Sequence, residues 1–394
     1  MAGANSSGVQ RGGRRPLAIR TTKLERPPHP PPYLGALGNG IRRAHRAKRN
    51  ARFRAWDLTR RVCDGVGMTQ LRFGILGAAR IAPKALIVPV EQVDTAVVAR
   101  VAARDRGRAE AFAAEHGIGE VSGSYQELIE ADDVDVVYNP LPMNLHAEWT
   151  IAALQAGKHV LCEKPFASNA VEAAEMVRVA EETGQILGEA FHHRYHPLWL
   201  RIFELLDAGT IGRITRAEGY FNISIPRPDI RWDYATSGGS LMDLGCYSTM
   251  WVRHVVGEEP TVTEAEAVLG PEHIDAAIWA ELEFPSGATG RVESSMINEA
   301  DPEIRLEIAG TRGSISVENP LSPYNGNTLT IRTENGETSA SILDDTTYVH
   351  MLRAFCDHVV HGTAFPTRGQ DSIDNMAAID AIYLAAGLPL RGEK

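Results

Sequence analysis

The most constraining feature of this sequence is the alternation of short apolar runs with helical patterns between residues 71 and 190. Apolar runs at 71–76, 96–102, 134–138 and 159–162 each lead into a segment of helix-forming composition. Parallel strands need crossover connections of this kind, so the pattern predicts an α/β fold: a Rossmann-type, doubly wound parallel sheet. The loops after the strands then gather at one edge of the sheet, where open α/β sheets bind ligands.

The first run ends in a turn, residues 77–82 with the sequence GAARIA, that is a G-x-A-x-x-A form of the dinucleotide fingerprint. Small residues let the backbone approach a pyrophosphate, and the helix behind the turn offers its N-terminus to that anion. Alanines replace the second and third glycines of the usual motif. We therefore expect Gly77, Ala79, Arg80 and Ile81 to bind a dinucleotide cofactor.

The end of the second run bears on the choice between NADP and NAD. Enzymes that use NAD usually place an acidic residue there to bind the ribose 2′-hydroxyl. Here Arg104 follows the run closely and Asp105 comes next. A planar guanidinium suits a 2′-phosphate, so the sequence favours NADP over NAD. The alternative is that Arg104 faces solvent at the start of a helix.

Two further stretches follow strand ends of the same predicted sheet. Residues 139–146 bring Asn144 and His146 to the ligand-binding edge, although His146 could serve simply to begin a helix. The fourth run ends in Glu163 and Lys164, followed by proline. A lysine at this edge indicates a functional site. The alternative is a surface lysine that pairs with Glu163.

The pattern changes after residue 191. Segments with period-two alternation dominate from 214 to 333 and are separated by turns such as FPSGATG. They indicate an α+β domain with a large, mostly antiparallel sheet that buries one face. We expect residues 68–190 to form the nucleotide-binding domain. Residues 191–394 should form a substrate-binding domain whose sheet makes a homodimer or larger homo-oligomer.

The segment 227–257 of this second half is rich in polar and aromatic side chains. Asp243 and Tyr247 are four residues apart, which places a carboxylate and a phenol on one face of a helix. Tyr247 could also be an ordinary core tyrosine, and Trp232 is expected to line the substrate pocket. The histidines around Arg194 lack the spacing of a metal site, so no metal is predicted.

Taken together, these motifs resemble the Gfo/Idh/MocA family of nicotinamide oxidoreductases. The stretches GILGAARIA, AGKHVLCEKP, GEAFHHRYHP and GGSLMDLGCY follow the order and spacing of that family over about residues 70–390. Tyrosine at 247, where many relatives have histidine, resembles the dihydrodiol dehydrogenase and glucose–fructose oxidoreductase branch. By this resemblance Lys164, Asp243 and Tyr247 are catalytic, and Arg194 lies near the cofactor.

The resemblance implies hydride transfer between a nicotinamide and a carbinol or carbonyl carbon of a sugar, polyol or dihydrodiol. A phenol with a pKa near ~10 is a weak base, so we expect Lys164 to lower the pKa of Tyr247. Lys164, Trp232, Asp243 and Tyr247 should contact the substrate, and Glu163 and Lys164 should border the cofactor. An alternative is a non-catalytic NAD(P)-dependent sugar sensor of the same fold; the presence of both Lys164 and Tyr247 favours the enzyme.

Residues 1–67 differ from the rest in charge. They carry 15 Lys/Arg and three acidic residues, whereas the remaining chain carries 25 basic and 47 acidic residues. With its proline- and glycine-rich run, this segment is predicted to be a disordered extension. The alternatives are a leader upstream of a true start at Met68, and a nucleic-acid or targeting role. Scattered cysteines and the lack of a long apolar run predict a cytoplasmic protein without a membrane span.

Overall fold

The first sheet of the chain is fully parallel, as the alternating pattern predicts. The computed structural model describes residues 70–298 and 302–392. The strands of this sheet are β1 (Leu71–Leu76), β2 (Ala96–Ala102), β3 (Glu120–Val121), β4 (Val136–Asn139), β5 (His159–Cys162) and β6 (Leu187–Glu189). Their order is β3-β2-β1-β4-β5-β6, and all neighbours pair in parallel. The strand order reverses direction between β1 and β4, and open α/β sheets bind ligands at the carboxyl ends of the strands at such a point.

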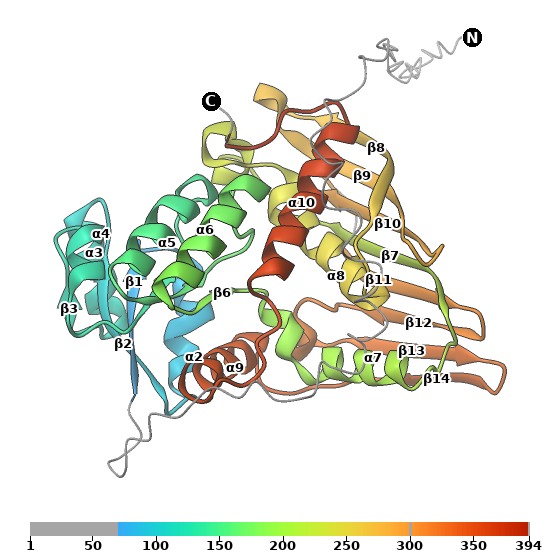
Figure 1. Ribbon diagram of the computed structural model, residues 1–394, viewed down its shortest axis with the longest axis horizontal. Helices are drawn as coiled ribbons and strands as arrows, with labels where there is room; N and C mark the ends of the chain where they lie inside the picture. The colour runs from blue at the N-terminus through green and yellow to red at the C-terminus, as the bar shows by residue number, and fades with distance from the viewer. Residues whose placement is uncertain (1–69, 299–301, 393–394) are drawn as a thin grey trace, which may run out of the picture. The chain divides into compact units, whose positions relative to one another are not determined.

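Helices connect these strands and cover the sheet (Figure 1). They are η2 (Pro83–Ile87), α2 (Val88–Val90), α3 (Arg106–His116), α4 (Tyr125–Glu130), η3 (Met143–Leu145), α5 (His146–Gln155) and α6 (Ala170–Thr183). The Asn169 side chain caps α6 by accepting a hydrogen bond from Glu172 N, and Gly184 ends the helix in the left-handed conformation. The sequence predicts both ends, because each residue satisfies backbone groups that the helix leaves free.

One helix on this sheet comes from the far end of the chain. α9 (Thr347–His361) was not predicted from the sequence. Its buried residues Val349, Leu352 and Phe355 share one apolar core with Phe73 of β1. Figure 1 shows α9 beside α2. A segment far past residue 191 therefore completes the core of the parallel sheet.

The second sheet has eight strands. They are β7 (Ile214–Asn222), β8 (Thr261–Leu269), β9 (Asp275–Glu283), β10 (Thr289–Ser295), β11 (Glu303–Gly310), β12 (Gly313–Glu318), β13 (Thr328–Thr333) and β14 (Gly336–Ala340). Their order is β14-β13-β12-β11-β7-β10-β9-β8. All neighbours are antiparallel except β7 and β10, which confirms the predicted mostly antiparallel sheet.

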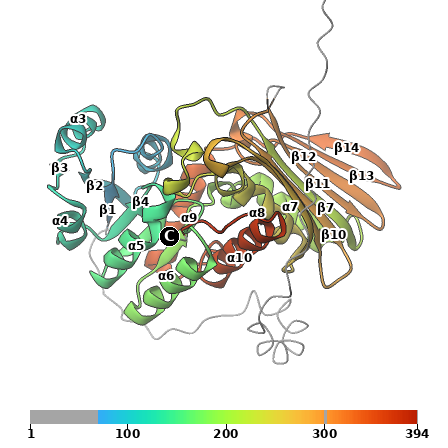
Figure 2. The same ribbon diagram turned by 90° about the horizontal axis from the view of Figure 1, so that it is seen from above.

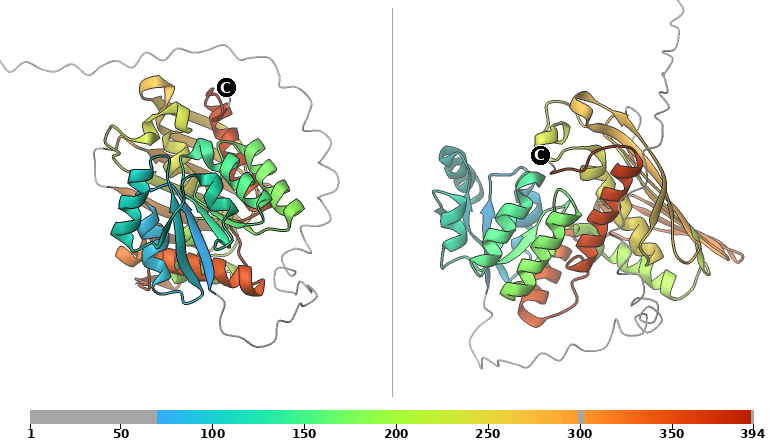
Figure 3. Two further views of the ribbon diagram at one scale, coloured as in Figure 1. Left: turned by 90° about the vertical axis from the view of Figure 1, so that its left-hand side faces the viewer. Right: turned by 45° about the horizontal axis from the view of Figure 1, so that its top comes forward.

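Helices α8 (Cys246–Val256) and α10 (Gln370–Ala385) pack on one face of this sheet. α8 approaches β7 so closely that a Cβ atom on Gly219 would lie 2.8 Å from the carbonyl oxygen of Ser248. Figures 2 and 3 show that no helix of the described chain covers the opposite face. The remaining elements are η4 (His192–Tyr195), α7 (Pro197–Asp207), η5 (Ile230–Trp232), η6 (Tyr234–Thr236), η7 (Leu241–Gly245), η8 (Pro271–His273) and η9 (Pro323–Asn325).

Two further predictions from the sequence are a disordered segment at residues 1–67 and the lack of a membrane span. The segment 1–67 lies outside the described residues. Among residues 70–298 and 302–392, no helix combines the length and the apolar character needed to cross a bilayer.

Candidate active site

Lys164 follows β5 at the carboxyl edge of the parallel sheet, and Asp243 of η7 holds its ammonium group. Nζ lies 2.9 Å from Asp243 Oδ1 and 2.9 Å from the Asp243 carbonyl oxygen. The two side chains are 14% and 11% exposed. The sequence left open that the Lys164 ammonium pairs with Glu163. The structure shows instead that it pairs with Asp243. Glu163 Oε1 instead accepts a hydrogen bond of 2.7 Å from the hydroxyl of Tyr138.

The charges of this pair stabilise each other. Burial favours the neutral amine of Lys164, but the Asp243 carboxylate more than offsets it, and the pKa of Lys164 lies above its ordinary value. Burial likewise favours the neutral carboxyl of Asp243, but Lys164 and Arg231 hold the pKa of that carboxyl below its ordinary value. Arg231 Nε binds the second carboxylate oxygen at 2.6 Å. All three groups are therefore charged at neutral pH.

Tyr247, in the first turn of α8, is buried next to Lys164. The lysine Nζ lies 4.9 Å from the centre of the tyrosine ring. The hydroxyl lies 3.2 Å from His192 Nε2. Burial raises the pKa of Tyr247 well above its ordinary value. The prediction that Lys164 lowers this pKa is wrong, because the ammonium faces the ring and its charge is balanced by Asp243.

His192 links Tyr247 to α9 and is a residue to which the sequence analysis gave no role. Its Nδ1 lies 2.7 Å from Thr347 Oγ1, and its ring stacks on Tyr348 with the centroids 4.1 Å apart. Burial, reinforced by nearby ammonium groups, holds the pKa of His192 well below its ordinary value, so the imidazole is neutral at neutral pH. Its place in the stretch GEAFHHRYHP was the one signal that could have indicated it.

The turn after β1 has the conformation that the fingerprint requires. Gly77 has φ +88°, a left-handed conformation that favours glycine, and its N–H donates to Ala102 O at 2.6 Å. Ala79 and Ile81 are half-buried in the turn, and Arg80 is 86% exposed.

Two more arginines stand exposed after the neighbouring strand β2. These are Arg104 and Arg108, and the Arg108 side chain donates to Ala78 O at 3.4 Å. Together with Arg80 they provide three guanidinium groups near the carboxyl ends of β1 and β2. This donor set fits the phosphates of a dinucleotide. The nearby carboxylate of Asp105 is used locally, because it caps α3 by accepting a hydrogen bond of 2.8 Å from Arg108 N.

A row of ion pairs connects the turn after β1 with Lys164. Arg80 Nη2 lies 2.9 Å from Asp229 Oδ2, and Asp229 Oδ1 lies 2.9 Å from Arg231 Nη1. Arg231 binds Asp243, and Asp243 binds Lys164. The charge therefore alternates in sign along five side chains, from the fingerprint turn to the strand-end lysine. Nothing in the local sequence around Asp229 relates it to Arg80, so this contact was not predicted from the sequence.

The loop that carries Asp229 and Arg231 is held by its own backbone. Asp229 Oδ1 also accepts a hydrogen bond from Arg231 N at 3.1 Å, which caps η5. Gly239 N donates to Arg231 O at 3.0 Å, and a Cβ atom on Gly238 would lie 2.5 Å from that same carbonyl oxygen. Trp232 is half-buried beside this turn and donates from Nε1 to Ile225 O at 3.0 Å.

Comparison with known proteins identifies the family. The model of an oxidoreductase family with an NAD-binding Rossmann fold, Gfo/Idh/MocA, matches residues 71–191. The model of the Gfo/Idh/MocA C-terminal domain matches residues 199–316. The chain belongs to the Gfo/Idh/MocA oxidoreductase family. The family resemblance predicted from the sequence is confirmed.

Several known proteins are similar to this Gfo/Idh/MocA oxidoreductase. D-xylose 1-dehydrogenase (NADP(+)) 2 of Haloferax volcanii is 35% identical over 318 residues, which cover 80% of this chain and 97% of the relative. Trans-1,2-dihydrobenzene-1,2-diol dehydrogenase of Xenopus tropicalis is 33% identical over 253 residues, 64% of this chain and 76% of the relative. A 3-ketoreductase from Actinomadura kijaniata, solved with NADP and TDP-benzene, has a TM-score of 0.75 at 28% identity and covers 80% of this chain and 98% of its own. The chain is therefore an oxidoreductase whose cofactor is a nicotinamide dinucleotide.

His146 and Asn144 were predicted to bind the cofactor of this oxidoreductase. His146 is buried, and its ring nitrogens Nδ1 and Nε2 lie 2.9 Å from Pro165 O and 2.8 Å from Leu141 O. The prediction of a direct cofactor contact is corrected for His146, because both nitrogens face carbonyl groups of the chain itself. The histidine instead ties the loop after β5 to the loop after β4. Asn144 is exposed on η3.

Arg194 of the Gfo/Idh/MocA chain lies away from the cluster of Lys164 and Tyr247. Its guanidinium carbon lies 4.0 Å from the centre of the Phe203 ring on α7. Burial, and to a smaller extent the charge of Arg194, lower the pKa of His254. His254 follows Tyr247 by seven residues on α8, about two helical turns. Arg194 therefore lies near the part of α8 that carries His254, and its place near the cofactor stays a prediction.

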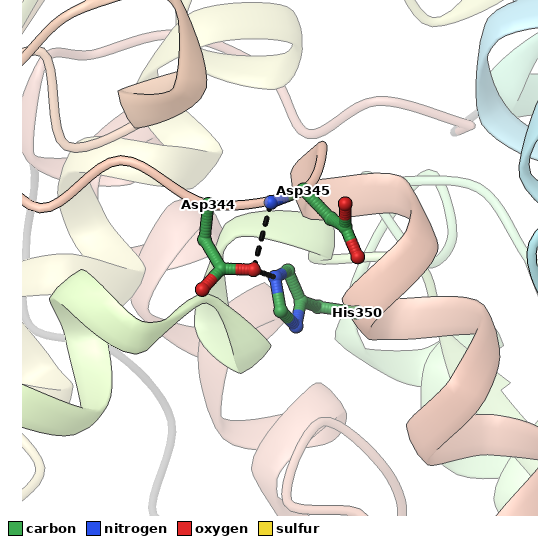
Figure 4. Close-up of side chains that lie close together, drawn as sticks. All are labelled: Asp344, Asp345 and His350. Atoms are coloured by element: carbon green, nitrogen blue, oxygen red, sulfur yellow. Dashed lines mark hydrogen bonds and ion pairs between the residues drawn. The ribbon is translucent and has the colours of Figure 1, made fainter.

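The side chains of the described residues offer one group with the spacing of a cation site. It consists of Asp344, Asp345 and His350, at the start of α9 (Figure 4). Asp344 Oδ1 already accepts a hydrogen bond from Asp345 N at 2.8 Å and lies 3.1 Å from His350 Nε2. Both carboxylates are exposed. Burial lowers the pKa of His350, so its contact with Asp344 is a hydrogen bond within the loop before α9, and these contacts identify no metal.

Proposed function

We propose that this chain catalyses hydride transfer between a nicotinamide dinucleotide and a carbinol or carbonyl carbon of a sugar, polyol or related diol. Lys164 and Tyr247 are the proton-handling pair of this reaction. The observation that carries the proposal is the lysine ammonium, which is held by Asp243 at 2.9 Å and lies 4.9 Å from the Tyr247 ring. A charged lysine and a buried phenol side by side, at the ligand-binding edge of a dinucleotide fold, suit this chemistry.

Lys164 binds and polarises the substrate oxygen. An ammonium group has three N–H donors, and two of those on Lys164 point to Asp243. The third donor serves the substrate oxygen. A positive charge next to that oxygen stabilises the negative charge that develops there when the carbonyl is reduced. Asp243 keeps the lysine charged and fixes its direction.

Tyr247 carries the proton. When bound, the nicotinamide supplies or accepts the hydride. In carbonyl reduction, the Tyr247 hydroxyl gives its proton to the substrate oxygen. In alcohol oxidation, the phenol oxygen takes the substrate proton while its own proton passes to His192 Nε2. The raised pKa of Tyr247 and the lowered pKa of His192 favour a protonated phenol and a neutral imidazole at neutral pH, which is the state from which Tyr247 can donate its proton in carbonyl reduction.

We propose NADP as the preferred cofactor. Arg104 is exposed directly after β2, where a guanidinium can bind the 2′-phosphate. The acidic residue that follows, Asp105, caps α3 with its Oδ1. The Haloferax volcanii relative carries NADP(+) in its name, and the Actinomadura kijaniata structure contains NADP. Arg104→Gln should weaken the binding of NADPH by about tenfold and leave NADH unchanged.

A sugar is the substrate class that the neighbourhood of Lys164 supports best. Lys164, Asp243 and Arg231 form a charged cluster, and the Arg227 guanidinium covers the indole of the next residue, Trp232, at 4.2 Å. Such a mixture of hydrogen-bonding groups and an aromatic surface suits a ring with hydroxyl and apolar faces. Named relatives act on D-xylose, a dihydrodiol and a 3-keto group.

The proposal is tested in two steps. Purified protein is first titrated with NADPH and NADH by fluorescence, and we expect binding of at least NADPH. It is then assayed by nicotinamide absorbance with D-xylose, D-glucose, inositol and trans-1,2-dihydrobenzene-1,2-diol, and with the corresponding carbonyl compounds. Loss of turnover in Lys164→Met and Tyr247→Phe, with NADPH binding retained, is the expected result. Normal turnover in both variants would contradict the assignment of the pair.

We further propose that the open face of the eight-stranded sheet forms a homodimer. Its side chains form a network of opposite charges across β7, β9, β10 and β11, which includes Arg216, Glu281, Arg291 and Arg305. A face with both signs is self-complementary, so two copies can pair about a twofold axis. Light scattering after size-exclusion chromatography should give a dimer. Arg305→Glu should dissociate it, whereas Arg178→Glu on α6 should not.

A further inference from the structure

We propose that Asp229 is a positioning residue that holds Arg80 in the free enzyme, and that Arg80 exchanges Asp229 for the cofactor pyrophosphate. This inference rests on the proposed nicotinamide-dependent function. It starts from the ion pair of 2.9 Å between Arg80 Nη2 and Asp229 Oδ2. Arg80 belongs to the fingerprint turn, whereas Asp229 belongs to the loop of the second half that also carries Arg231.

The partners of this ion pair are held very differently. The Asp229 side chain is 10% exposed, and Oδ1 accepts hydrogen bonds from the backbone N and the Nη1 of Arg231. The Arg80 side chain is 86% exposed. Breaking the pair therefore leaves Asp229 in place, with Arg231 as partner, while Arg80 is free to turn. The mobile partner is the one on the fingerprint turn.

The pyrophosphate competes with Asp229 for the same guanidinium. In a doubly wound fold the pyrophosphate lies at the turn after the first strand, which here is the turn of Arg80. A guanidinium that binds two phosphate oxygens through two parallel N–H groups is held more strongly than one that binds a single carboxylate oxygen, as Arg80 binds Asp229. Asp229 thus opposes binding of the dinucleotide until Arg80 has left it.

The exchange at Arg80 also changes the charges around Lys164. Once Arg80 has left, Arg231 is the remaining cation at Asp229, and Arg231 binds Asp243, which holds Lys164. The charge distribution around Lys164 therefore depends on whether the cofactor is bound. By linkage, groups that bind at Lys164 and the dinucleotide that binds at Arg80 affect each other's affinity.

Binding of NADPH to Asp229→Asn is the direct test. The variant should bind NADPH about threefold to tenfold more tightly than the wild type, because Arg80 is already free. Adenosine 2′-monophosphate, which has no pyrophosphate, should show no change in competition titrations. The matched control is Asp233→Asn, which removes the same charge from the same loop without a contact to Arg80. A thermal melt of each variant verifies that it is folded, and Asp229→Ser replaces any asparagine variant that is not.

A double-mutant cycle separates this exchange from a general effect of charge. In the Arg80→Gln background, Asp229→Asn should change the NADPH affinity by less than twofold, because the competition no longer exists. Turnover gives a second readout: Asp229→Asn should lower kcat while it lowers the KM for NADPH, since Arg231 loses the partner that orients it toward Asp243.

Three results would overturn the inference. The first is unchanged or weaker NADPH binding in Asp229→Asn. The second is an equally large gain in NADPH affinity in the control Asp233→Asn. The third is an equally large gain from Asp229→Asn in the Arg80→Gln background. If the wild type bound neither NADPH nor NADH, the proposed function itself would fail. If the wild type bound them and Asp229→Asn did not differ from it, this inference alone would fail.

Discussion

The two ends of the ion-pair row use the same kind of interaction in different surroundings. At the inner end the side chains of Lys164 and Asp243 are 14% and 11% exposed, whereas at the outer end Arg80 is 86% exposed. A buried pair that loses one partner leaves an uncompensated charge out of water, which is costly. An exposed pair gains little over separate hydrated charges. Burial therefore makes the inner end fixed and the outer end exchangeable.

The largest effect is expected at the inner end, from Tyr247→Phe. The variant keeps the ring next to Lys164 but loses the proton, so kcat for carbonyl reduction should fall by about 10²–10⁴-fold with little change in KM. Steady-state kinetics with the substrate found in the screen measure this. Tyr195→Phe is the control, since Tyr195 is a tyrosine whose hydroxyl bonds to Thr367, away from the pair. A fall of kcat below tenfold would remove Tyr247 from the chemistry.

Replacing Asp243 or Asp229 by asparagine compares how much each end of the ion-pair row contributes to the free energy of unfolding. Asp243→Asn leaves the buried charge of Lys164 uncompensated and removes one of the two carboxylates that bind Arg231, so it should lower the free energy of unfolding by about 3–5 kcal/mol. Asp229→Asn, at the outer end, should lower it by less than this, because Arg80 is exposed to water and Arg231 keeps Asp243 as its partner. Urea denaturation measures both. Equal losses would show that the two ends do not differ in the way that their exposure indicates.

The pH dependence of reduction should sharpen the comparison. The pKa values of Tyr247 and Lys164 are both raised, so both groups keep their protons as the pH rises, and kcat/KM should stay nearly level from neutral pH to about pH 9. In Asp243→Asn, burial and the charge of Arg231 act on Lys164 without the opposing carboxylate and lower its pKa, so kcat/KM should begin to fall at a lower pH than in the wild type. Identical profiles would mean that Asp243 does not keep the lysine charged.

The smallest effect is expected from salt at the outer end. At about 1 M ionic strength the Debye length shrinks to about 3 Å, so the exposed pair of Arg80 and Asp229 is screened. The ratio of the NADPH affinities of Asp229→Asn and the wild type should therefore fall toward one. The stability lost in Asp243→Asn should hardly change, because salt does not enter the buried pair. A salt-independent difference at Asp229 would indicate a change in packing.

Predictions from the sequence were best where the signal was local. The strand–turn–helix at Gly77, the caps of α6 and the position of Lys164 at the end of β5 each depend on neighbouring residues. Predictions that depended on packing were incomplete. α9 joins the parallel sheet from the far end of the chain, and His192 reaches Tyr247 from a different element. His146 has the right place along the chain, but its ring is turned to backbone carbonyls.

The sign of the pKa shift of Tyr247 illustrates the limit of sequence reasoning. Tyrosine and lysine as residue types suggest that the lysine lowers the pKa of the phenol. The sign depends instead on burial, on the direction from which the ammonium approaches the ring, and on the carboxylate that balances it. None of these three quantities is encoded by the spacing of residues along the chain.

The sequence by itself determined the parallel sheet, the dinucleotide turn, the mostly antiparallel second sheet and the delivery of Lys164 to the ligand-binding edge. These follow from periodicity and from residues adjacent in the chain, because backbone hydrogen bonding and side-chain direction are set locally. The tertiary structure decided which carboxylate holds Lys164, how Tyr247 is protonated, and that Asp229 joins the fingerprint turn to the lysine. Electrostatic energies depend on distance and burial in space, and folding alone brings residues 80, 164, 229, 231 and 243 together.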